Sequence, residues 1–384
     1  MVNESKAINE SESESGSENV WIKNLRKEVD KDIHGTRLEY FVKCPQILLD
    51  IFKVKEKDYV LAYCLYNVLL ANLFMIGILP IFYYDYIHWG WLLILNIIKT
   101  ALVGAPRFIL ALHASTHSPC LSPKWFNSFL TEYFLCFCHG IVPGMYRLHH
   151  VIMHHKENNI CPRDLSSTMP YQRDNIFHFL HYYFKFQVSL LFELPYWCYK
   201  KRLYKRCLTS IICEVLYFSF FYISYQIKPS ISMIMIIIPN IVQSIALMFG
   251  NWSQHQFINP NDYDNDYSLT TNVIGSKYNM MAFNDGYHII HHKYPYLHFK
   301  QLPLKFINNE LKEHQKYNSI NFKNIDQFVI GVCTHIGAYN TLYNNFLPIT
   351  QEQYKWTIND FINELKRRLK PINQSIINAH KKES

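Results

Sequence analysis

The chain has 384 residues, of which 49% are hydrophobic and 16% are aromatic, whereas only 18% are charged. The 12 glycines exclude a collagen-like chain, and the aromatic content excludes a chain that is disordered throughout. The formal net charge of +8 is not gathered into a compact basic run with interleaved aromatic residues, so the composition favours a membrane protein over a nucleic-acid-binding protein.

The N-terminal part of the chain precedes any apolar segment of membrane-spanning length. Residues 1–20 are rich in Ser and Glu and predict a disordered cytosolic tail. Residues 21–57 are rich in Lys and Arg, which favours a cytosolic segment in front of the membrane domain. We expect the membrane domain at residues 58–305 and a cytosolic C-terminal region at residues 306–384, with an amphipathic helix over residues 350–370.

Four apolar segments are predicted to be membrane-spanning helices, because each has about the 20 residues that a helix needs to cross a bilayer. They are residues 59–84, 89–112, 207–227 and 231–250. Short turns near Tyr86 and Lys228 connect them in pairs, so we expect two helical hairpins. Lys and Arg residues before the first span and between the two pairs indicate that both termini and both long connecting segments face the cytosol.

Two further apolar segments, residues 125–146 and 176–198, are interrupted by charged residues, histidine and proline. We expect both to be helices in the membrane interface with their apolar faces toward the lipid, and the alternative is that one of them spans. The ten cysteines form no C-x-x-C pair, which favours reduced thiols over disulfides. The predicted fold is therefore an all-α membrane protein with four spans in two hairpins, interfacial helices and a histidine-rich cytosolic cap.

Three dense clusters contain many of the 19 histidines. They are His113-x3-His117, His149-His150-x3-His154-His155 and His288-x2-His291-His292, and a related pair, Asn251-x3-His255, follows the last predicted span. Side chains three or four residues apart lie on one face of a helix, where they can share a metal ion. Neutral imidazole suits iron, zinc, copper and nickel, so the clusters predict a site with nitrogen ligands and an asparagine nearby.

The remaining histidines are interpreted more conservatively. His139, His178 and His181 lie in apolar segments, where we expect them to pack against neighbours or to lie in the interface. His149 and His298 are candidates for positions just behind the ligands. The histidines without a partner at ligand spacing are His34, His88, His314, His335 and His380.

The three clusters and the two pairs of predicted spans resemble the membrane fatty acid desaturase and hydroxylase superfamily over residues 55–305. Asn251-x3-His255 resembles the Asn and His that acyl desaturases of this family carry after the last span, and Asp285-Gly286-Tyr287-His288 resembles the lead into the third histidine box. The resemblance implies two iron ions held by nine histidines, with Asn251 acting on one iron through a water molecule. The nine histidines are His113, His117, His150, His154, His155, His255, His288, His291 and His292. Asp285 is a further candidate for a position behind the ligands.

The chemistry that the resemblance implies requires a metal. A methylene group within an acyl chain has no acidic proton and no leaving group, so acid–base and nucleophilic catalysis have nothing to act on. Iron bound by imidazole can activate O2 with two electrons. Removal of two hydrogens makes the enzyme a desaturase, insertion of oxygen makes it a hydroxylase, and the histidine boxes leave both alternatives open.

Departures from the family pattern bear on the partners and the substrate. The third box begins with His288 rather than Gln, and the chain has no His-Pro-Gly-Gly haem motif, so we expect a separate electron donor such as cytochrome b5 or a ferredoxin. Acyl-CoA, acyl-lipid and sphingolipid substrates all stay open. A non-catalytic metal sensor or transporter is disfavoured, because the boxes lie at or beyond the ends of the spans rather than at the membrane midplane.

The last residues of the chain bear on its location. Lys381 and Lys382 resemble a dilysine signal for return to the endoplasmic reticulum, and the alternative is a plain basic tail. We therefore expect a multi-pass protein of the endoplasmic reticulum membrane.

Overall fold

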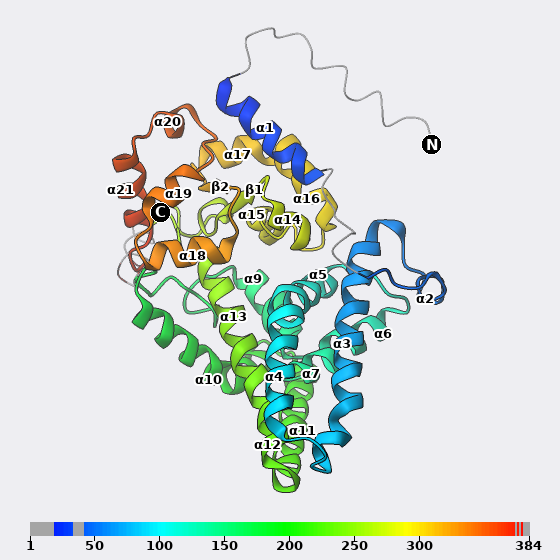
Figure 1. Cartoon of the computed structure of the whole chain (residues 1–384). Coiled ribbons are helices and arrows are strands. Elements are labelled where there is room, and N and C mark those ends of the chain that lie inside the picture. Colours follow the sequence, from blue (N-terminus) through cyan, green and yellow to red (C-terminus); the bar gives the residue numbers. More distant parts are fainter. Residues whose placement is uncertain (1–18, 34–41, 373–374, 376–377, 379–384) are drawn as a thin grey trace.

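A computed structural model describes residues 19–33, 42–372, 375 and 378. The chain is mostly helical, and the described residues contain one pair of short parallel strands. Figure 1 shows a tapered bundle of long helices at one end of the molecule and a broader cap of short helices at the other. Most of the expected tail, His34, His380 and the Lys381-Lys382 pair lie outside the described residues.

The described residues contain three helices that are long and apolar enough to cross a membrane, or four if one bent pair is counted as a single span. The three are α3 (Tyr59–Tyr83), α11 (Tyr204–Ile227) and the helix Pro229–Gln254, which is built from α12 (Pro229–Ser232), η6 (Met233–Ile237) and α13 (Ile238–Gln254). They coincide with three of the four predicted spans.

The bent pair coincides with the predicted span at residues 89–112. It consists of α4 (Trp89–Lys99), the π-helical segment η3 (Thr100–Phe108) and α5 (Ile109–His117), with a bend of 42°. The segment η3 between the two helices is π-helical, so its backbone hydrogen bonds depart from the regular α-helical pattern. The bend directs α5 and its two histidines from the bundle into the base of the cap (Figure 1).

The turns of the two helix pairs meet at the narrow end of the bundle (Figure 1). Asp85 follows α3, and Lys228 lies between α11 and α12. The Lys228 ammonium donates to the Asp85 carboxylate, so the two turns are joined at the same end of the molecule.

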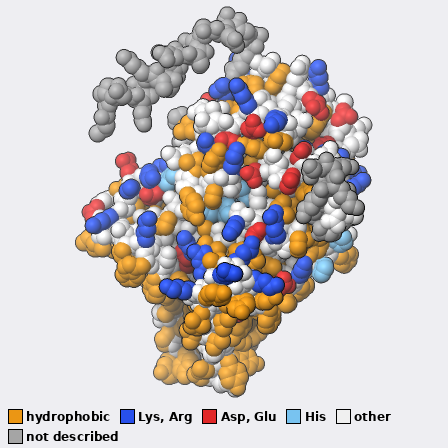
Figure 2. Space-filling model, turned by 180° about the vertical axis from the view of Figure 1, so that it is seen from behind, with side chains coloured by type: hydrophobic (Ala, Val, Ile, Leu, Met, Phe, Trp, Pro, Cys, Tyr) orange, Lys and Arg blue, Asp and Glu red, His pale blue; other side chains and the backbone are white. Residues whose placement is uncertain are grey.

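The surface of the tapered bundle is apolar. Figure 2 shows hydrophobic side chains over this end, with Lys and Arg side chains along its upper border. Only 11% of the most apolar window of α11 is buried within the chain. An apolar surface of this extent is typical of a protein that is embedded in a membrane.

Helix α10 (Ile176–Lys200) coincides with the second segment that we expected in the interface, and it is not among the candidate spans of the described residues. Large apolar side chains three or four residues apart are exposed along one side of it, namely Phe177, Leu180, Phe184, Val188, Phe192 and Tyr196. A helix with one exposed apolar stripe and one packed face suits a position along the membrane interface.

The first segment that we expected in the interface is packed more deeply than predicted. It forms α6 (Lys124–Ser128), η4 (Phe129–Leu135) and α7 (Cys136–Cys138), and Leu130, Leu135 and Cys136 are buried in the same core as residues of α3 and α5. The sequence shows an apolar face here but not what covers it, and the structure shows that other helices of the chain cover much of it.

Three polar side chains, Asn72, Lys99 and His139, lie buried inside the bundle and contact one another. Asn72 Nδ2 lies 3.0 Å from His139 Nε2, and Lys99 Nζ donates to Asn72 Oδ1 at 3.2 Å. The His139 ring stacks on Phe108 with 4.1 Å between the ring centroids. The expectation that His139 packs rather than binds a metal is therefore supported by its neighbours.

The cap is assembled from short elements that close around a second core. Strand β1 (Asn272–Ile274) pairs in parallel with β2 (Asn321–Lys323), which joins the segment after α13 to the C-terminal region. The elements of the cap are η7 (Asp266–Ser268), α14 (Lys277–Met281), α15 (His288–Lys293), η8 (Phe299–Gln301), α16 (Leu302–Lys305), η9 (Phe306–Glu310), α17 (Leu311–Lys316), α18 (Gln327–His335), α19 (Tyr339–Asn344), α20 (Gln351–Tyr354) and α21 (Ile358–Arg368). The core of the C-terminal region includes Phe322, Phe361 and Leu365.

The ends of the described chain also belong to the cap. Helix α1 (Val20–Ile33) lies across α16, whereas α2 (Gln46–Ile51) and η2 (Glu56–Asp58) lead into α3. The expected amphipathic helix over residues 350–370 is present as α20 and α21, and Thr357 and Asp360 form a capping box at the start of α21. All ten cysteines are free thiols, as predicted.

Candidate metal centre

Four separate parts of the chain bring the predicted ligands together. Helix α5 carries the first box, and α8 (Met145–Arg147), the π-helical η5 (Leu148–His154) and α9 (His155–Glu157) carry the second. His255 follows the last residue of α13, and the third box occupies α15. The two spans between the second box and His255 return the chain to the same end of the bundle (Figure 1).

Five histidines form the first group: His113, His117, His150, His155 and His291. Each offers a ring nitrogen, and these five atoms lie within 4.8 Å of one another. The Nε2 atoms of His113 and His291 are 2.8 Å apart, and those of His150 and His155 are 3.2 Å apart. Both nitrogens of His117 are buried without a hydrogen-bond partner.

The second group contains His154, His255 and His292, whose ligand nitrogens also lie within 4.8 Å of one another. The ring centroid of His288 lies 4.8 Å from that of His292 and 5.3 Å from that of His255. The structure therefore brings all nine predicted histidines into one region, with His288 beside the second group.

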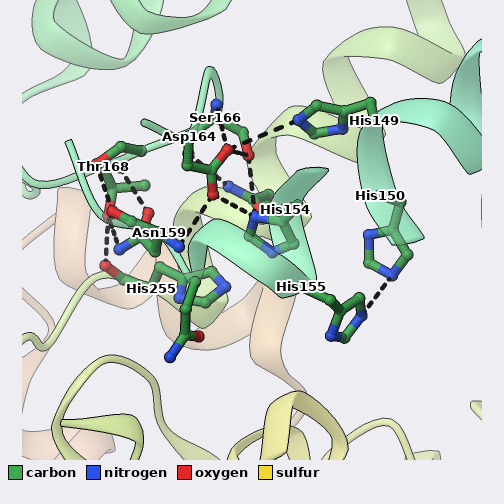
Figure 3. Close-up of polar contacts among 12 residues, drawn as sticks. His149, His150, His154, His155, Asn159, Asp164, Ser166, Thr168 and His255 are labelled. Carbon is green, nitrogen blue, oxygen red and sulfur yellow. Dashed lines mark hydrogen bonds and ion pairs between the residues drawn. The ribbon is translucent and has the colours of Figure 1, made fainter. Parts of the chain in front are cut away.

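Oxygen atoms fix the orientation of the rings in the second group. Nδ1 of His154 lies 2.6 Å from a carboxylate oxygen of Asp164 (Figure 3), Nδ1 of His255 lies 3.1 Å from the Leu269 carbonyl oxygen, and Nδ1 of His292 lies 2.9 Å from Asn158 Oδ1. Because a neutral imidazole has one N–H group, an acceptor at Nδ1 leaves the lone pair on Nε2. The Nε2 atoms of this group are thereby free to bind a metal.

Unpartnered ring nitrogens are the test of whether a metal fits. The Nε2 atoms of His255, His288 and His292 are buried and have no hydrogen-bond partner. Both ring nitrogens of His117 also lack a partner. Buried polar atoms are almost always bonded, so several orphaned nitrogens that face one another need an explanation. A metal ion in each group would satisfy them.

Electrostatics keep the rings in the form that binds metals. Burial and the neighbouring histidines hold the pKa of His150, His155, His255, His291 and His292 well below the usual value. Burial alone would raise the pKa of Asp164, but His154 beside it holds that pKa well below its usual range. At neutral pH these five imidazoles are therefore neutral, the form that binds a metal, whereas the Asp164 carboxylate is ionised.

Arg147 connects the first two boxes. Its guanidinium Nη1 donates to the carbonyl oxygen of Thr116 at 3.0 Å and to Glu132 Oε1 at 3.2 Å. Thr116 precedes His117, and Arg147 lies three residues before His150. The arginine thus fixes the distance between α5 and η5.

The remaining predicted site residues have different surroundings. Asn251 Nδ2 donates to the Ser166 carbonyl oxygen at 3.2 Å and to the Tyr182 hydroxyl at 2.7 Å. His149 lies 3.9 Å from Asp164 (Figure 3), next to the second group. His298 pairs with Asp58 at 2.9 Å, at the start of α3, and Asp285 lies within 3.4 Å of two box histidines.

Sequence reasoning named Asp285 but missed the oxygen acceptors of His154, His255 and His292. Asp164 is fully buried, and its oxygens also accept from the Asn159 and Ser166 backbone amides. A metal-binding histidine usually donates its other ring N–H to a carboxylate or carbonyl oxygen. A search for an acidic residue close to each box would therefore have found Asp164, ten residues after His154, but neither Asn158 nor the Leu269 carbonyl has such a signal.

A small cavity of about 30 Å³ lies against the first group. Its walls include His113 and His291 and the apolar side chains of Leu110, Phe283 and Leu297. This volume holds about two water molecules. An acyl chain would need these walls to move apart.

The model of a protein family described as fatty acid desaturase matches residues 89–320 of the chain. The matched residues are more than half of the chain and include all nine histidines. No curated protein matches the chain.

Proposed function

The chain belongs to the fatty acid desaturase family, and we propose that it is a membrane-bound two-iron enzyme that introduces a double bond into the fatty acyl chain of a lipid. The observation that carries the proposal is the convergence of two groups of buried histidine nitrogens at one end of an apolar helix bundle.

We assign one iron to each group. His113, His117, His150, His155 and His291 would hold the first iron, and His154, His255, His288 and His292 would hold the second. Asn251 would act on the second iron through a water molecule. When bound, iron supplies the power to oxidise an unactivated methylene group with O2 and two electrons.

The residues of the chain prepare this chemistry. Asp164, Asn158 and the Leu269 carbonyl hold a proton at Nδ1 of their histidines, so that Nε2 keeps its lone pair. Burial of the rings keeps water away from the reacting groups. The apolar side chains next to the first group would hold the acyl chain at a fixed depth, which selects the carbon atoms that react.

The proposed topology has four spans in two hairpins, with both termini and the nine histidines of the candidate metal centre on the cytosolic side of the endoplasmic reticulum membrane. The ion pair between Asp85 and Lys228 supports it, because it places the two hairpin turns together at the end opposite the histidines. In this topology residues 58–305 form the membrane domain and residues 306–384 form a cytosolic C-terminal region.

Electrons would come from a separate donor such as cytochrome b5 or a ferredoxin. The donor would reach the site from the cap, since the other end of the molecule is the apolar bundle. A lipid acyl chain would come from the membrane side.

Expression in a desaturase-deficient host, followed by mass spectrometry of total lipids, tests the reaction. A desaturase yields acyl chains that are two mass units lighter than their precursors, whereas a lipid hydroxylase yields chains that are sixteen units heavier. Purified protein should contain about two irons per chain. Two bound metals without any lipid product would favour a non-catalytic metal-binding protein and contradict the proposal.

A further inference from the structure

One carboxylate lies between the two histidine groups. Asp285 Oδ1 is 3.3 Å from Nδ1 of His113 and 3.4 Å from Nδ1 of His288. His113 belongs to the first group, and His288 lies beside the second. The side chain of Asp285 is only 12% exposed, so water does not compete for these contacts.

The surroundings of Asp285 hold this carboxylate in place. Its other oxygen, Oδ2, accepts from Gln254 Nε2 at 2.8 Å, and the same amide nitrogen lies 2.8 Å from Gln327 Oε1. Gln254 is the last residue of α13, and Gln327 is the first residue of α18. The carboxylate is therefore fastened to the last span and to the C-terminal region at once.

The other acceptors around the site serve the second group alone. Asp164 contacts His154, Asn158 contacts His292 and the Leu269 carbonyl contacts His255. Within the described part of the chain, Asp285 is the carboxylate that contacts both a histidine of the first group and a histidine beside the second group. Metal binding by both groups therefore depends on this one side chain.

We propose that Asp285 is a positioning residue that couples the two metal sites. With one carboxylate oxygen 3.3 Å from Nδ1 of His113 and 3.4 Å from Nδ1 of His288, Asp285 favours an N–H group on Nδ1 of both rings by electrostatic attraction, which leaves Nε2 of each ring for its own metal. Loss of this acceptor releases both rings at once, so the two sites lose affinity together. The inference rests on the proposed two-metal function and adds a residue that links the two ions.

Metal titration separates a shared acceptor from one that serves a single site. Purified, metal-stripped protein is titrated with Co²⁺, and binding is followed by ligand-field absorption and by calorimetry. The wild-type chain should bind two ions. Asp285→Asn should weaken the binding of both ions by about 10- to 100-fold, the usual effect of removing an acceptor behind a histidine ligand.

Asp164→Asn is the matched control, because it removes a carboxylate that serves only the second group. Asp164→Asn should weaken the binding of one ion by a similar factor and leave the binding of the other ion unchanged. If Asp285→Asn also weakened only one ion, or neither, the coupling would be disproved. A wild-type chain that binds fewer than two ions would overturn the two-metal function itself, together with this inference.

Asp285→Glu keeps the test decisive if Asp285→Asn does not fold. The longer side chain retains the charge but displaces the carboxylate by one methylene group, so both affinities should fall together and by less. A fall in one affinity alone would contradict the proposal.

Discussion

The position of a single proton decides whether each histidine can act as a ligand. Asp164 is fully buried and contacts His154 at 2.6 Å, which places the proton of that ring on Nδ1. Ten residues separate this pair in the sequence, so the chain supplies ligand and acceptor from one continuous segment.

Removal of one ligand from either group should abolish the activity. His117→Ala, His154→Ala and His291→Ala are each expected to give no detectable lipid product and less bound iron, because each ring lies in a group whose nitrogens face one another. Lipid mass spectrometry and metal analysis of purified protein measure both effects. His181→Ala is the control, since this exposed residue of α10 should be dispensable; near-normal turnover in any of the three variants would remove that histidine from the ligand set.

Asp32 fastens α1 to the segment that leads into the third box. One of its oxygens, Oδ2, accepts from the Gly275 amide at 2.6 Å, from Asn279 Nδ2 at 3.1 Å and from the Tyr287 hydroxyl at 2.8 Å. The other oxygen is buried without a partner. Burial raises the pKa of this carboxyl from its ordinary value of 3.8 to about 6.

The raised pKa of Asp32 predicts a pH-dependent contribution to stability. Between about pH 4 and pH 6 the folded chain binds the proton of the Asp32 carboxyl more tightly than the unfolded chain does. Protonated Asp32 therefore adds about 3 kcal/mol to the free energy of unfolding below pH 4, and this stabilisation is lost as the pH rises through 6. Asp32→Asn should remove that dependence and be at least as stable as the wild type above pH 6. Asp32→Ala should cost about 1–3 kcal/mol, because it leaves three donors without an acceptor.

Thermal unfolding of detergent-solubilised protein, measured at several pH values between 4.5 and 7.5, tests this prediction. The quantity to compare is the difference in stability between variant and wild type, which removes the effect of other titrating groups. An Asp32→Asn protein with the same pH dependence as the wild type would show that Asp32 does not titrate in this range.

Among the helices, the bent α4–η3–α5 pair has the clearest consequence. Because the pair is bent by 42°, α4 lies within the bundle while α5 holds His113 and His117 at the base of the cap. The joined turns at Asp85 and Lys228 lie at the other end. If the pair is one span, the nine histidines of the two groups lie on one side of the membrane and both turns lie on the other.

Cysteine labelling in sealed microsomes tests this arrangement. Arg163→Cys and Lys355→Cys should react with a membrane-impermeant maleimide from outside the vesicles, whereas Tyr86→Cys should react only after permeabilisation. All three positions are exposed, and the ten native cysteines are buried or half-buried, so the unsubstituted chain supplies the background. Labelling of Arg163→Cys and Tyr86→Cys from the same side would contradict the four-span topology.

At the scale of the whole molecule, Arg173 joins three distant parts of the chain. Its fully buried guanidinium donates to the Gln256 carbonyl after α13 and to the carbonyls of Arg368 and Lys370 near the C-terminus, each at 2.7 Å. It also donates to three carbonyls of its own segment, at residues 168, 169 and 171. The five N–H groups of this planar cation thus contact six carbonyl oxygens, and the two on Nη1 are shared among three of them.

Replacement of Arg173 by lysine should destabilise the cap, because an ammonium has three donors and lacks the planar geometry of the guanidinium. Arg173→Lys is expected to cost about 3 kcal/mol or more, since several buried carbonyl groups lose a charged donor. The loss of stability is measured by thermal unfolding, with the exposed Arg202→Lys as the control. Equal stability of the two variants would show that the carbonyl groups find other partners.

The general fold could be predicted from the sequence, because the physical signals are local. Uncharged apolar segments of about 20 residues predict spans, and three of the four coincide with single long helices. The packing of residues 124–138 could not be predicted, since an apolar face meets lipid or protein equally well and only the neighbouring α3 and α5 decide which.

The histidine boxes were predictable for the same reason, since ligand spacing of three or four residues is a local property of the helix. Their division into two groups was not. His154 and His155 are neighbours in the sequence but belong to different groups, as do His291 and His292. Successive residues on a helix point about 100° apart, so each pair faces two directions, and only the packing of α5, η5 and α15 against one another determines which group each histidine joins.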